Sequence, residues 1–205
     1  MQKLQSMIEN ISLVDYELNT MSIQEFVPFE QRLGYKLPDD YKYFCQTLGA
    51  GTLAELFDVF CINNNSISDN NDITSEMIER IRYGMEIREQ IRHSGDEEDP
   101  YPNRNDTEYI SLLQSALIFA SFNGEQIFFW DLRSYRDFDD SYDIYWHVID
   151  TPDADEPIKI CRKFSDFICE FCYGQLVCDL IPNFCAQIPR EIIYTFCPWR
   201  QSTNT

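Results

Sequence analysis

Glycine and histidine are scarce in this chain, and their scarcity argues against several kinds of active site. The 205 residues include seven glycines and two histidines. The glycines form no loop of the kind that cradles phosphate groups, so nucleotide binding has no support. No cysteine or serine lies in a recognisable nucleophile motif that His93 or His147 could serve, which argues against nucleophilic catalysis.

Basic residues are also few. The chain has 16 lysines and arginines against 35 aspartates and glutamates, which gives a formal net charge of −19. Such a charge repels nucleic acids and anionic membrane surfaces, and it accelerates encounter with basic partners. The alternative is that an acidic surface only keeps an aromatic-rich protein in solution. We therefore expect no nucleic-acid or membrane partner, and we expect any protein partner to be basic.

Long apolar runs are missing as well. No window is long enough to cross a bilayer, and the first residues, MQKLQSMIENIS, lack the apolar core of a signal peptide. We therefore expect a cytoplasmic protein whose eight cysteines are reduced thiols.

A zinc site must be weighed because four cysteines follow one another towards the C-terminus. Cys169 and Cys172 lie inside a helical pattern rather than on the tight turn that zinc-binding pairs prefer, and Cys178 and Cys185 follow them. Buried cysteine often acts as a small apolar residue. The sequence therefore favours structural thiols, and no metal or cofactor is expected.

What the chain does contain is a core-forming composition, with 44% hydrophobic and 15% aromatic residues. Predicted strands and helices are interspersed. The clearest pairing is a hairpin of 116–122 with 125–132, joined by Asn123 and Gly124, which tolerate the positive φ of a tight turn. We expect a single α+β domain with a mainly antiparallel twisted sheet of about 4–6 strands, flanked by N-terminal and C-terminal helices.

Proline and glycine set the expected helix boundaries near the N-terminus. Residues 1–13 read as a short amphipathic helix. Ser22 and Glu25 match a capping box, but Pro28 is expected to be the first residue of the next helix, which Gly34 ends.

The middle of the chain alternates periodic and polar segments. A helix is expected from Pro38 to Gly49, and a strand over 55–62. Residues 63–72 are expected to form an exposed polar loop, followed by a long helix over 74–93. Residues 95–106 form a second acidic loop.

The sequence of the last third of the chain predicts two strands and two helices. The strands cover 143–150 and 157–163, and Ser165 is expected to cap a helix that ends at Gly174. A short helix is expected over 190–196.

The segment FEQRLGYKLPDDYKYFCQTLGAG (29–51) resembles the opening signature of the SUKH superfamily. That group includes the Smi/Knr-type fungal cell-wall regulators, the bacterial Syd protein and many toxin-immunity proteins. ASFNGEQIFFWDL (120–132) resembles the family's glycine turn, and 158–171 its last strand and helix. A closing Asn-Gly-Gly of the family is replaced here by Gly49, Ala50 and Gly51. The residues that carry the likeness are Glu30, Leu33, Gly34, Leu37, Pro38, Asp39, Tyr41, Phe44, Gly124 and Asp131.

This resemblance implies an N-terminal helix over 1–21 and a SUKH-like domain over 22–174. The domain would hold a helical and acidic insertion at about 63–108, with a C-terminal extension over 175–205 packed on it. The family is non-enzymatic, so the resemblance implies a protein-binding role, most often the neutralisation of a toxin such as a basic nuclease. A regulatory scaffold like the fungal relatives is the alternative. The family supplies no binding residues, because that surface varies among its members.

Residues 131–156 form the candidate binding surface. They carry nine acids against Arg133 and Arg136, a net −7, and aromatic residues are interleaved among them. Aromatic anchors ringed by charge are typical of binding hot spots. A solvated acidic face is the alternative, and a hydrolase using Asp131 and Asp137 ranks last. The proposed contact residues are Arg133, Tyr135, Asp137, Phe138, Asp139, Asp140, Tyr142 and Asp143. We expect a monomer or a weak homodimer.

Overall fold

A computed structural model describes most of the chain. The described residues are 2–14, 17–62, 64–94, 105–149, 156–174, 176, 179 and 194–199. The expected acidic loop over 95–106 lies almost wholly outside them, as do Cys178, Cys185 and the acids at 150, 153 and 155.

A mixed sheet forms the centre of the domain. Its strands, in spatial order, are β1 (Ser12–Leu13), β8 (Thr195–Pro198), β2 (Gly51–Leu53), β3 (Phe57–Val59), β4 (Ala116–Phe122), β5 (Gln126–Arg136), β6 (Ser141–Val148) and β7 (Ile158–Cys161). Only the β1–β8 pair among these is parallel. The α+β prediction is confirmed, but the described chain has eight strands rather than 4–6. The strands missed were β1, β2 and β8: β1 and the start of β8 lie in segments expected to be helical, and β2 is only three residues long.

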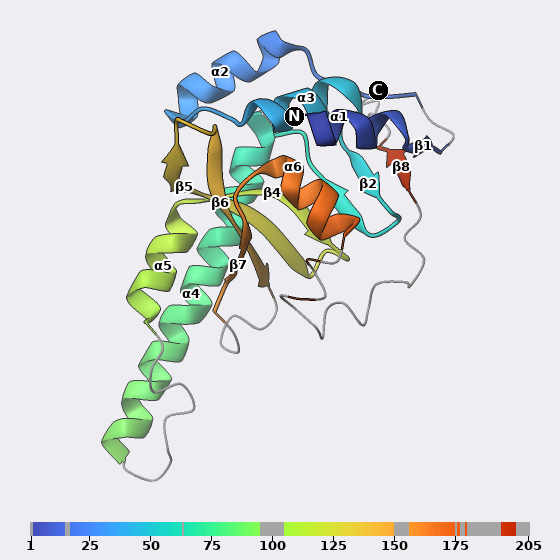
Figure 1. Ribbon diagram of the computed structural model, residues 1–205. Helices are drawn as coiled ribbons and strands as arrows, with labels where there is room; N and C mark the ends of the chain where they lie inside the picture. Colours follow the sequence, from blue (N-terminus) through green and yellow to red (C-terminus); the bar gives the residue numbers. More distant parts are fainter. Residues whose placement is uncertain are drawn as a thin grey trace, which may run out of the picture.

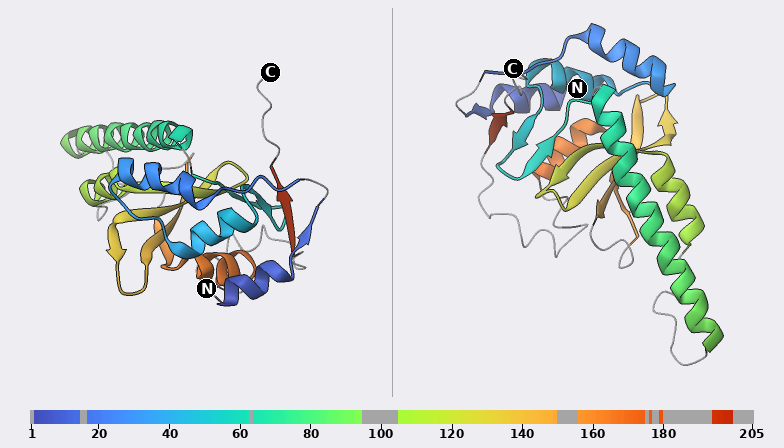
Figure 2. Two further views of the ribbon diagram at one scale, coloured as in Figure 1. Left: turned by 90° about the horizontal axis from the view of Figure 1, so that it is seen from above. Right: turned by 180° about the vertical axis from the view of Figure 1, so that it is seen from behind.

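Helices cover both faces of this sheet (Figures 1 and 2). They are α1 (Gln2–Glu9), α2 (Ile23–Leu33), α3 (Asp39–Thr47), α4 (Asn64–Ser94), α5 (Asp106–Gln114), α6 (Phe164–Asp166) and a π-helix, η1 (Phe167–Cys172). Figure 2 shows α4 and α5 on one face and α1, α3 and α6 on the other. Strand β5 serves both layers, because Phe128 and Trp130 join the core under α3 and α6, while Ile127 and Phe129 join the core under α4 and α5.

Aromatic rings fill the larger core. Trp130 stacks on Phe119 at 4.1 Å between ring centroids, and Tyr41 and Phe164 pack edge-on against each other at 5.2 Å. The Tyr41 hydroxyl donates to the Phe60 carbonyl at 2.7 Å and accepts from the Ile62 amide at 2.8 Å. A fully buried tyrosine hydroxyl needs such partners, since an unsatisfied one costs about 1–3 kcal/mol. The ring thereby fixes α3 against the end of β3.

The segment that resembles the SUKH opening folds as two helices joined by a tight corner. Gly34 ends α2 with φ of 72°. The side chain of Glu30 accepts from the Leu37 amide at 2.7 Å and from Lys42 Nζ at 3.0 Å, so it closes the corner. Pro38 then precedes the first residue of α3.

The expected start of α2 at Pro28 is wrong. The helix begins at Ile23, and the capping box of Ser22 and Glu25 forms, with the Ser22 amide donating to Glu25 at 2.7 Å. Pro28 lies inside the helix, where its ring removes one backbone hydrogen bond. Burial of Phe26 and Phe29 on the inward face offsets that loss.

The expected loop over 63–72 is also wrong, because α4 already begins at Asn64. The reason lies in tertiary contacts of Asn70, which is buried against β4. Its amide oxygen accepts from the Ile118 backbone at 2.6 Å, and its nitrogen donates to the Ala116 carbonyl at 3.2 Å. These bonds fix helical backbone in a segment whose Asn and Ser residues have poor helix propensity.

Two predictions at the C-terminal end need correction. Ser165 does not cap the last helix. Lys163 precedes that helix, and the Ser165 amide donates to Asp40 Oδ2 at 2.8 Å. Within the predicted helix 190–196, Thr195 and Phe196 belong to strand β8, which pairs with β2 and β1. Pairing along the backbone of distant strands thus overrides the local helical pattern.

Substitution of three glycines separates turn strain from steric clash. Gly34, Gly49 and Gly124 all have positive φ, but an added Cβ meets nothing within 4 Å at Gly34 and Gly124, whereas at Gly49 it would lie 2.1 Å from the Asn19 carbonyl oxygen. We expect Gly34→Ala and Gly124→Ala each to lower the free energy of unfolding by about 1 kcal/mol. Gly49→Ala should cost at least about 2 kcal/mol. Urea unfolding measures all three.

Gly124→Asn is the control, because asparagine tolerates the left-handed conformation better than alanine. Its cost should be smaller than that of Gly124→Ala. Equal losses at Gly49 and Gly124 would contradict the close approach of Asn19.

Candidate functional site

The tip of the β5–β6 hairpin carries most of the proposed contact residues. Strand β5 is buried from Gln126 to Leu132, and its outer part from Arg133 onwards is half-buried or exposed. Arg136 pairs with Ser141, so residues 137–140 form the turn. Phe138 in this turn is 81% exposed, more than any other large hydrophobic side chain in the described ranges.

Asp140 fixes the conformation of this turn. Its backbone is left-handed, with φ of 49°. Its carboxylate accepts from the Asp39 amide at 2.6 Å, from Lys36 Nζ at 3.0 Å and from the Tyr135 hydroxyl at 2.9 Å. The hairpin tip is therefore bound to the corner between α2 and α3, about one hundred residues earlier in the chain.

These contacts determine the titration of Asp140. Partial burial by itself would raise the pKa of this carboxyl group. The hydrogen bonds from the Asp39 amide, Lys36 and Tyr135 outweigh that effect and hold the pKa below its ordinary value.

Asp139 and Arg136 support the exposed ring from the other side. Asp139 accepts from Arg136 Nη2 at 2.9 Å and from the Ser141 hydroxyl at 2.7 Å. The Arg136 guanidinium lies over the Phe138 ring, 5.0 Å from its centroid. This cation–π contact restricts the rotamers of a side chain that otherwise has solvent around it.

Two further acids of the stretch, Asp131 and Asp143, are also paired with cations. Asp143 pairs with Lys159 at 2.8 Å and with Arg162. Asp131 pairs with Arg133 at 2.8 Å and accepts from the Ser115 hydroxyl at 2.6 Å. Sequence counting therefore overstated the local negative charge, because Lys36, Lys159 and Arg162 come from other segments and no spacing pattern connects them.

Asp137 differs from these acids. It is exposed at the tip, and it has no ion-pair partner in the part of the chain that the structure describes. Its carboxylate is thus available to an incoming cation.

Tyr142 is not a solvent-facing anchor, which corrects the expectation for this residue. Its side chain is 1% exposed, and its hydroxyl donates to the Lys36 carbonyl at 2.7 Å. Burial raises the pKa of Tyr142. Strand alternation alone could not predict its direction, because register shifts between Asp131 and Arg136 interrupt the pairing of β5 with β6. Tyr142 therefore supports the tip from inside, with Tyr135 packed on its ring at 4.9 Å.

A paired-carboxylate site is not formed by Asp131 and Asp137. Asp131 lies in the buried part of β5, whereas Asp137 lies in the turn six residues further on. At about 3.3 Å per strand residue, the two lie on the order of 15–20 Å apart. Carboxylates that act on one glycosidic bond lie within about 10 Å of each other.

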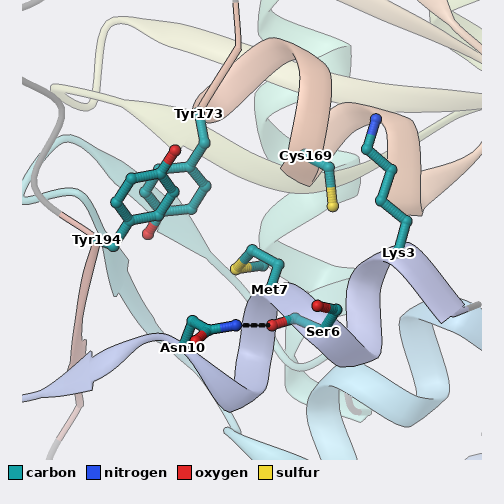
Figure 3. Close-up of a pocket in the computed structure, with 7 residues that line it drawn as sticks. All are labelled: Lys3, Ser6, Met7, Asn10, Cys169, Tyr173 and Tyr194. Atoms are coloured by element: carbon teal, nitrogen blue, oxygen red, sulfur yellow. Dashed lines mark hydrogen bonds between the residues drawn. The ribbon is translucent and has the colours of Figure 1, made fainter.

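A groove of about 550 Å³ lies elsewhere, between α1, η1 and the start of β8 (Figure 3). Two of its polar side chains are engaged with neighbours. Lys3 pairs with Glu170, and the Asn10 amide donates to the Ser6 carbonyl at 2.6 Å. Burial raises the pKa of the Cys169 thiol, which keeps it protonated and unreactive. The groove thus presents no converging catalytic groups.

Within the described ranges, no three His, Cys, Asp or Glu side chains gather in a way that could hold a metal ion. Cys169 and Cys172 are free thiols, and Cys172 is buried in the core. Among the described helices, none is long and apolar enough to span a membrane.

The protein is an α+β domain with helices on both sides of its sheet. Residues 20–170 match the SMI1 / KNR4 family (SUKH-1), and the chain belongs to that family. Members of this family are generally non-enzymatic immunity or regulatory proteins. A comparison with curated proteins gave no significant match.

Replacement of Asp140 tests the support of the tip. We expect Asp140→Asn to lower the free energy of unfolding by about 1–2 kcal/mol at pH 7, because an amide replaces a charged acceptor. Since the folded-state pKa lies below the ordinary value of about 3.9, the stabilisation is fully present above that value. It is lost as the pH falls through the folded-state pKa. The difference between the variant and the parent protein should therefore shrink below about pH 4, as measured by urea unfolding at several pH values.

Asp137→Asn is the matched control. Because Asp137 contacts no cation in the described structure, its replacement should leave stability within about 0.5 kcal/mol. Equal destabilisation by both variants, or a difference that does not depend on pH, would contradict the assigned role of Asp140.

Proposed function

We propose that this chain is a protein-binding immunity protein that neutralises a basic toxin domain through the tip of the β5–β6 hairpin. The observation that carries the proposal is the 81% exposure of Phe138 on a turn that Asp139 and Asp140 fix through internal hydrogen bonds. A phenylalanine held in one orientation in solvent loses little conformational entropy when a partner encloses it. Family membership supports the general role, since immunity and regulatory proteins act by binding other proteins.

The arrangement of the sheet favours the tip over the sheet faces. Helices α4 and α5 cover one face, where they bury Ile118, Ile127 and Phe129. The other face is buried under α1, α3 and α6. A partner therefore meets edges, loops and outer helix surfaces, and the hairpin tip presents the most exposed apolar side chain among the described residues.

Electrostatics supports a basic partner. The net charge of −19 gives a long-range attraction for cations. At the tip itself, Asp139 and Asp140 are occupied by internal contacts, which leaves Asp137 to meet a partner's cation. Overall charge then governs the association rate, while Phe138 governs the lifetime of the complex.

A regulatory adaptor role is the second candidate, and it would use the same protein-binding surface. Partner identity distinguishes the two functions. A toxin partner must lose its toxicity when the chain is co-expressed, whereas a regulatory partner has no toxicity to lose. The first experiment is co-expression with any basic toxin domain that is encoded beside this gene, with cell growth as the readout. The absence of rescue by the intact chain, with no such toxin bound, would overturn the immunity function.

Truncation of the exposed ring tests the contact surface. Phe138→Ala should weaken binding to the toxin that the intact chain neutralises by about 30-fold or more, since a central aromatic anchor contributes about 2 kcal/mol or more. Isothermal titration calorimetry measures the dissociation constant. Tyr83→Ala is the control, because Tyr83 is 65% exposed on α4 and far from the tip in sequence. Equal affinities for parent and Phe138→Ala would move the interface away from the hairpin.

Charge reversal at the tip tests the role of Asp137. Asp137→Lys should slow association several-fold at low salt and reduce its salt dependence, with dissociation little changed. Stopped-flow mixing at two salt concentrations gives both rates. Reversal of Asp139 or Asp140 is unsuitable, since either change would also remove contacts that hold the turn. An unchanged association rate for Asp137→Lys would show that the acidic tip does not steer the partner.

A further inference from the structure

Helix α2 exposes apolar side chains on its outer face. Ile23 is 46% exposed and Val27 is 48% exposed, and they lie four residues apart, on the same side of the helix. Phe26 and Phe29 are the buried residues of α2 and face the core, whereas Ile23 and Val27 remain exposed. Single exposed apolar residues are common on protein surfaces, but two neighbouring ones on one helix face form a small apolar patch that nothing in the described structure covers.

The C-terminal end of α2 lies beside the hairpin tip (Figure 1). Two contacts define this placement. The Lys36 side chain donates to Asp140 at 3.0 Å, and the Tyr142 hydroxyl donates to the Lys36 carbonyl at 2.7 Å. The closed corner at Glu30 and the cap at Gly34 keep α2 in a fixed direction relative to this joint. The outer face of α2 and the tip therefore hold a fixed mutual orientation.

Tyr35 connects the two parts. It is 40% exposed and follows α2 directly, one residue before Lys36. Four of the ten exposed large hydrophobic side chains in the described ranges thus lie on α2, on the corner or at the tip. The other six are divided among β1 and the residue after it, α4, and the two residues that flank β8, with two at each place. Leu13, Val14 and Tyr194 also lie together, because β1 pairs with β8, but the group on α2, the corner and the tip includes Phe138, the most exposed of the ten.

This surface carries a negative net charge, as the whole chain does. Residues 23–39 and 136–140 together carry six acids and three bases, and Lys42 pairs with two of these acids, Glu30 and Asp39, which leaves a net −2. The side chain of Asp39 is 61% exposed there, and Asp137 is exposed at the tip. An apolar strip bordered by exposed carboxylates fits a protein surface with apolar depressions and cations around them.

We infer that the outer face of α2, Tyr35 and the hairpin tip form one continuous binding ridge for a basic protein. This inference rests on the proposed function and extends it, because it adds Ile23, Val27 and Tyr35 to the interface. The partner contacts two elements whose relative position Asp140 fixes. Sequence reasoning placed no contact on α2, because the expected helix began at Pro28 and left Ile23 and Val27 outside it.

Site-specific photo-crosslinking in the source cell tests the ridge. A benzophenone amino acid replaces Phe138, Val27 or Tyr83, one position per variant, and mass spectrometry identifies the crosslinked peptides. We expect positions 138 and 27 to crosslink to the same basic protein, at neighbouring peptides of its surface. Position 83 should give no crosslink to that protein.

The outcomes separate the ridge from the proposed function. Crosslinks to the basic partner from position 138 but none from position 27 would overturn the ridge and leave the tip as the interface. The absence of that partner at both positions would overturn the proposed contact surface and the ridge together. Equal crosslinking from position 83, or an acidic partner, would also overturn the inference.

Affinity measurements with the crosslinked partner give an independent readout. Val27→Ala should weaken binding about fivefold, since it removes two exposed methyl groups from the contact. Gln24→Ala, at an exposed polar position of α2, is the control and should leave affinity unchanged. A Val27→Ala protein with unaltered affinity would contradict the ridge, provided that its melting temperature equals that of the parent.

Discussion

The carboxylate of Asp140 joins two segments that lie about one hundred residues apart, and the candidate binding surface depends on that joint. One of its oxygens accepts from the Asp39 amide at the start of α3, and the other accepts from Lys36 and from Tyr135. With these bonds in place, a residue in the left-handed conformation can turn the chain from β5 into β6. Removal of the carboxylate would leave the corner and the turn without their common acceptor.

The exposed ring of Phe138 is a consequence of this arrangement. The acids on its C-terminal side point inwards, one to Arg136 and Ser141 and the other to the α2–α3 corner. The phenylalanine is thereby left in solvent under the Arg136 guanidinium. An acidic sequence thus yields a surface whose most prominent feature is apolar, because four of the six acids described in 131–156 serve as internal acceptors. Charge remains important at long range, where the net −19 acts on an approaching partner as a whole.

The long helix α4 changes which surfaces the domain can offer. With α5, it buries the second face of the sheet around Ile127 and Phe129. Figure 1 shows its outer part extending beyond α5 and the sheet. Burial of both sheet faces restricts a partner to edges, loops and outer helix surfaces. This restriction explains why a hairpin tip and the helix beside it become the candidate surface in this member of the SMI1 / KNR4 family.

The sequence by itself determined the features that local chemistry controls. The Asn123-Gly124 turn, the helix stop at Gly34 and the capping box of Ser22 with Glu25 follow from backbone conformation and from hydrogen bonds between near neighbours. The α+β class and the family likeness follow from the order of such features. The acidic–aromatic stretch over 131–156 could also be located, because it is defined by residue types alone.

Tertiary structure alone decided the rest, since those outcomes depend on partners distant in sequence. Asn70 makes helix of an expected loop by bonding to β4, and β8 forms where a helix was expected because β2 and β1 supply its hydrogen bonds. Tyr142 is buried because its hydroxyl donates to the Lys36 carbonyl and its ring packs against the Tyr135 ring. Cations that pair with the acidic stretch likewise come from other segments, namely Lys36, Lys159 and Arg162. Local propensities are a few tenths of a kcal/mol per residue, whereas each buried pairing contributes about 1 kcal/mol or more. Long-range pairing therefore prevails wherever the two conflict.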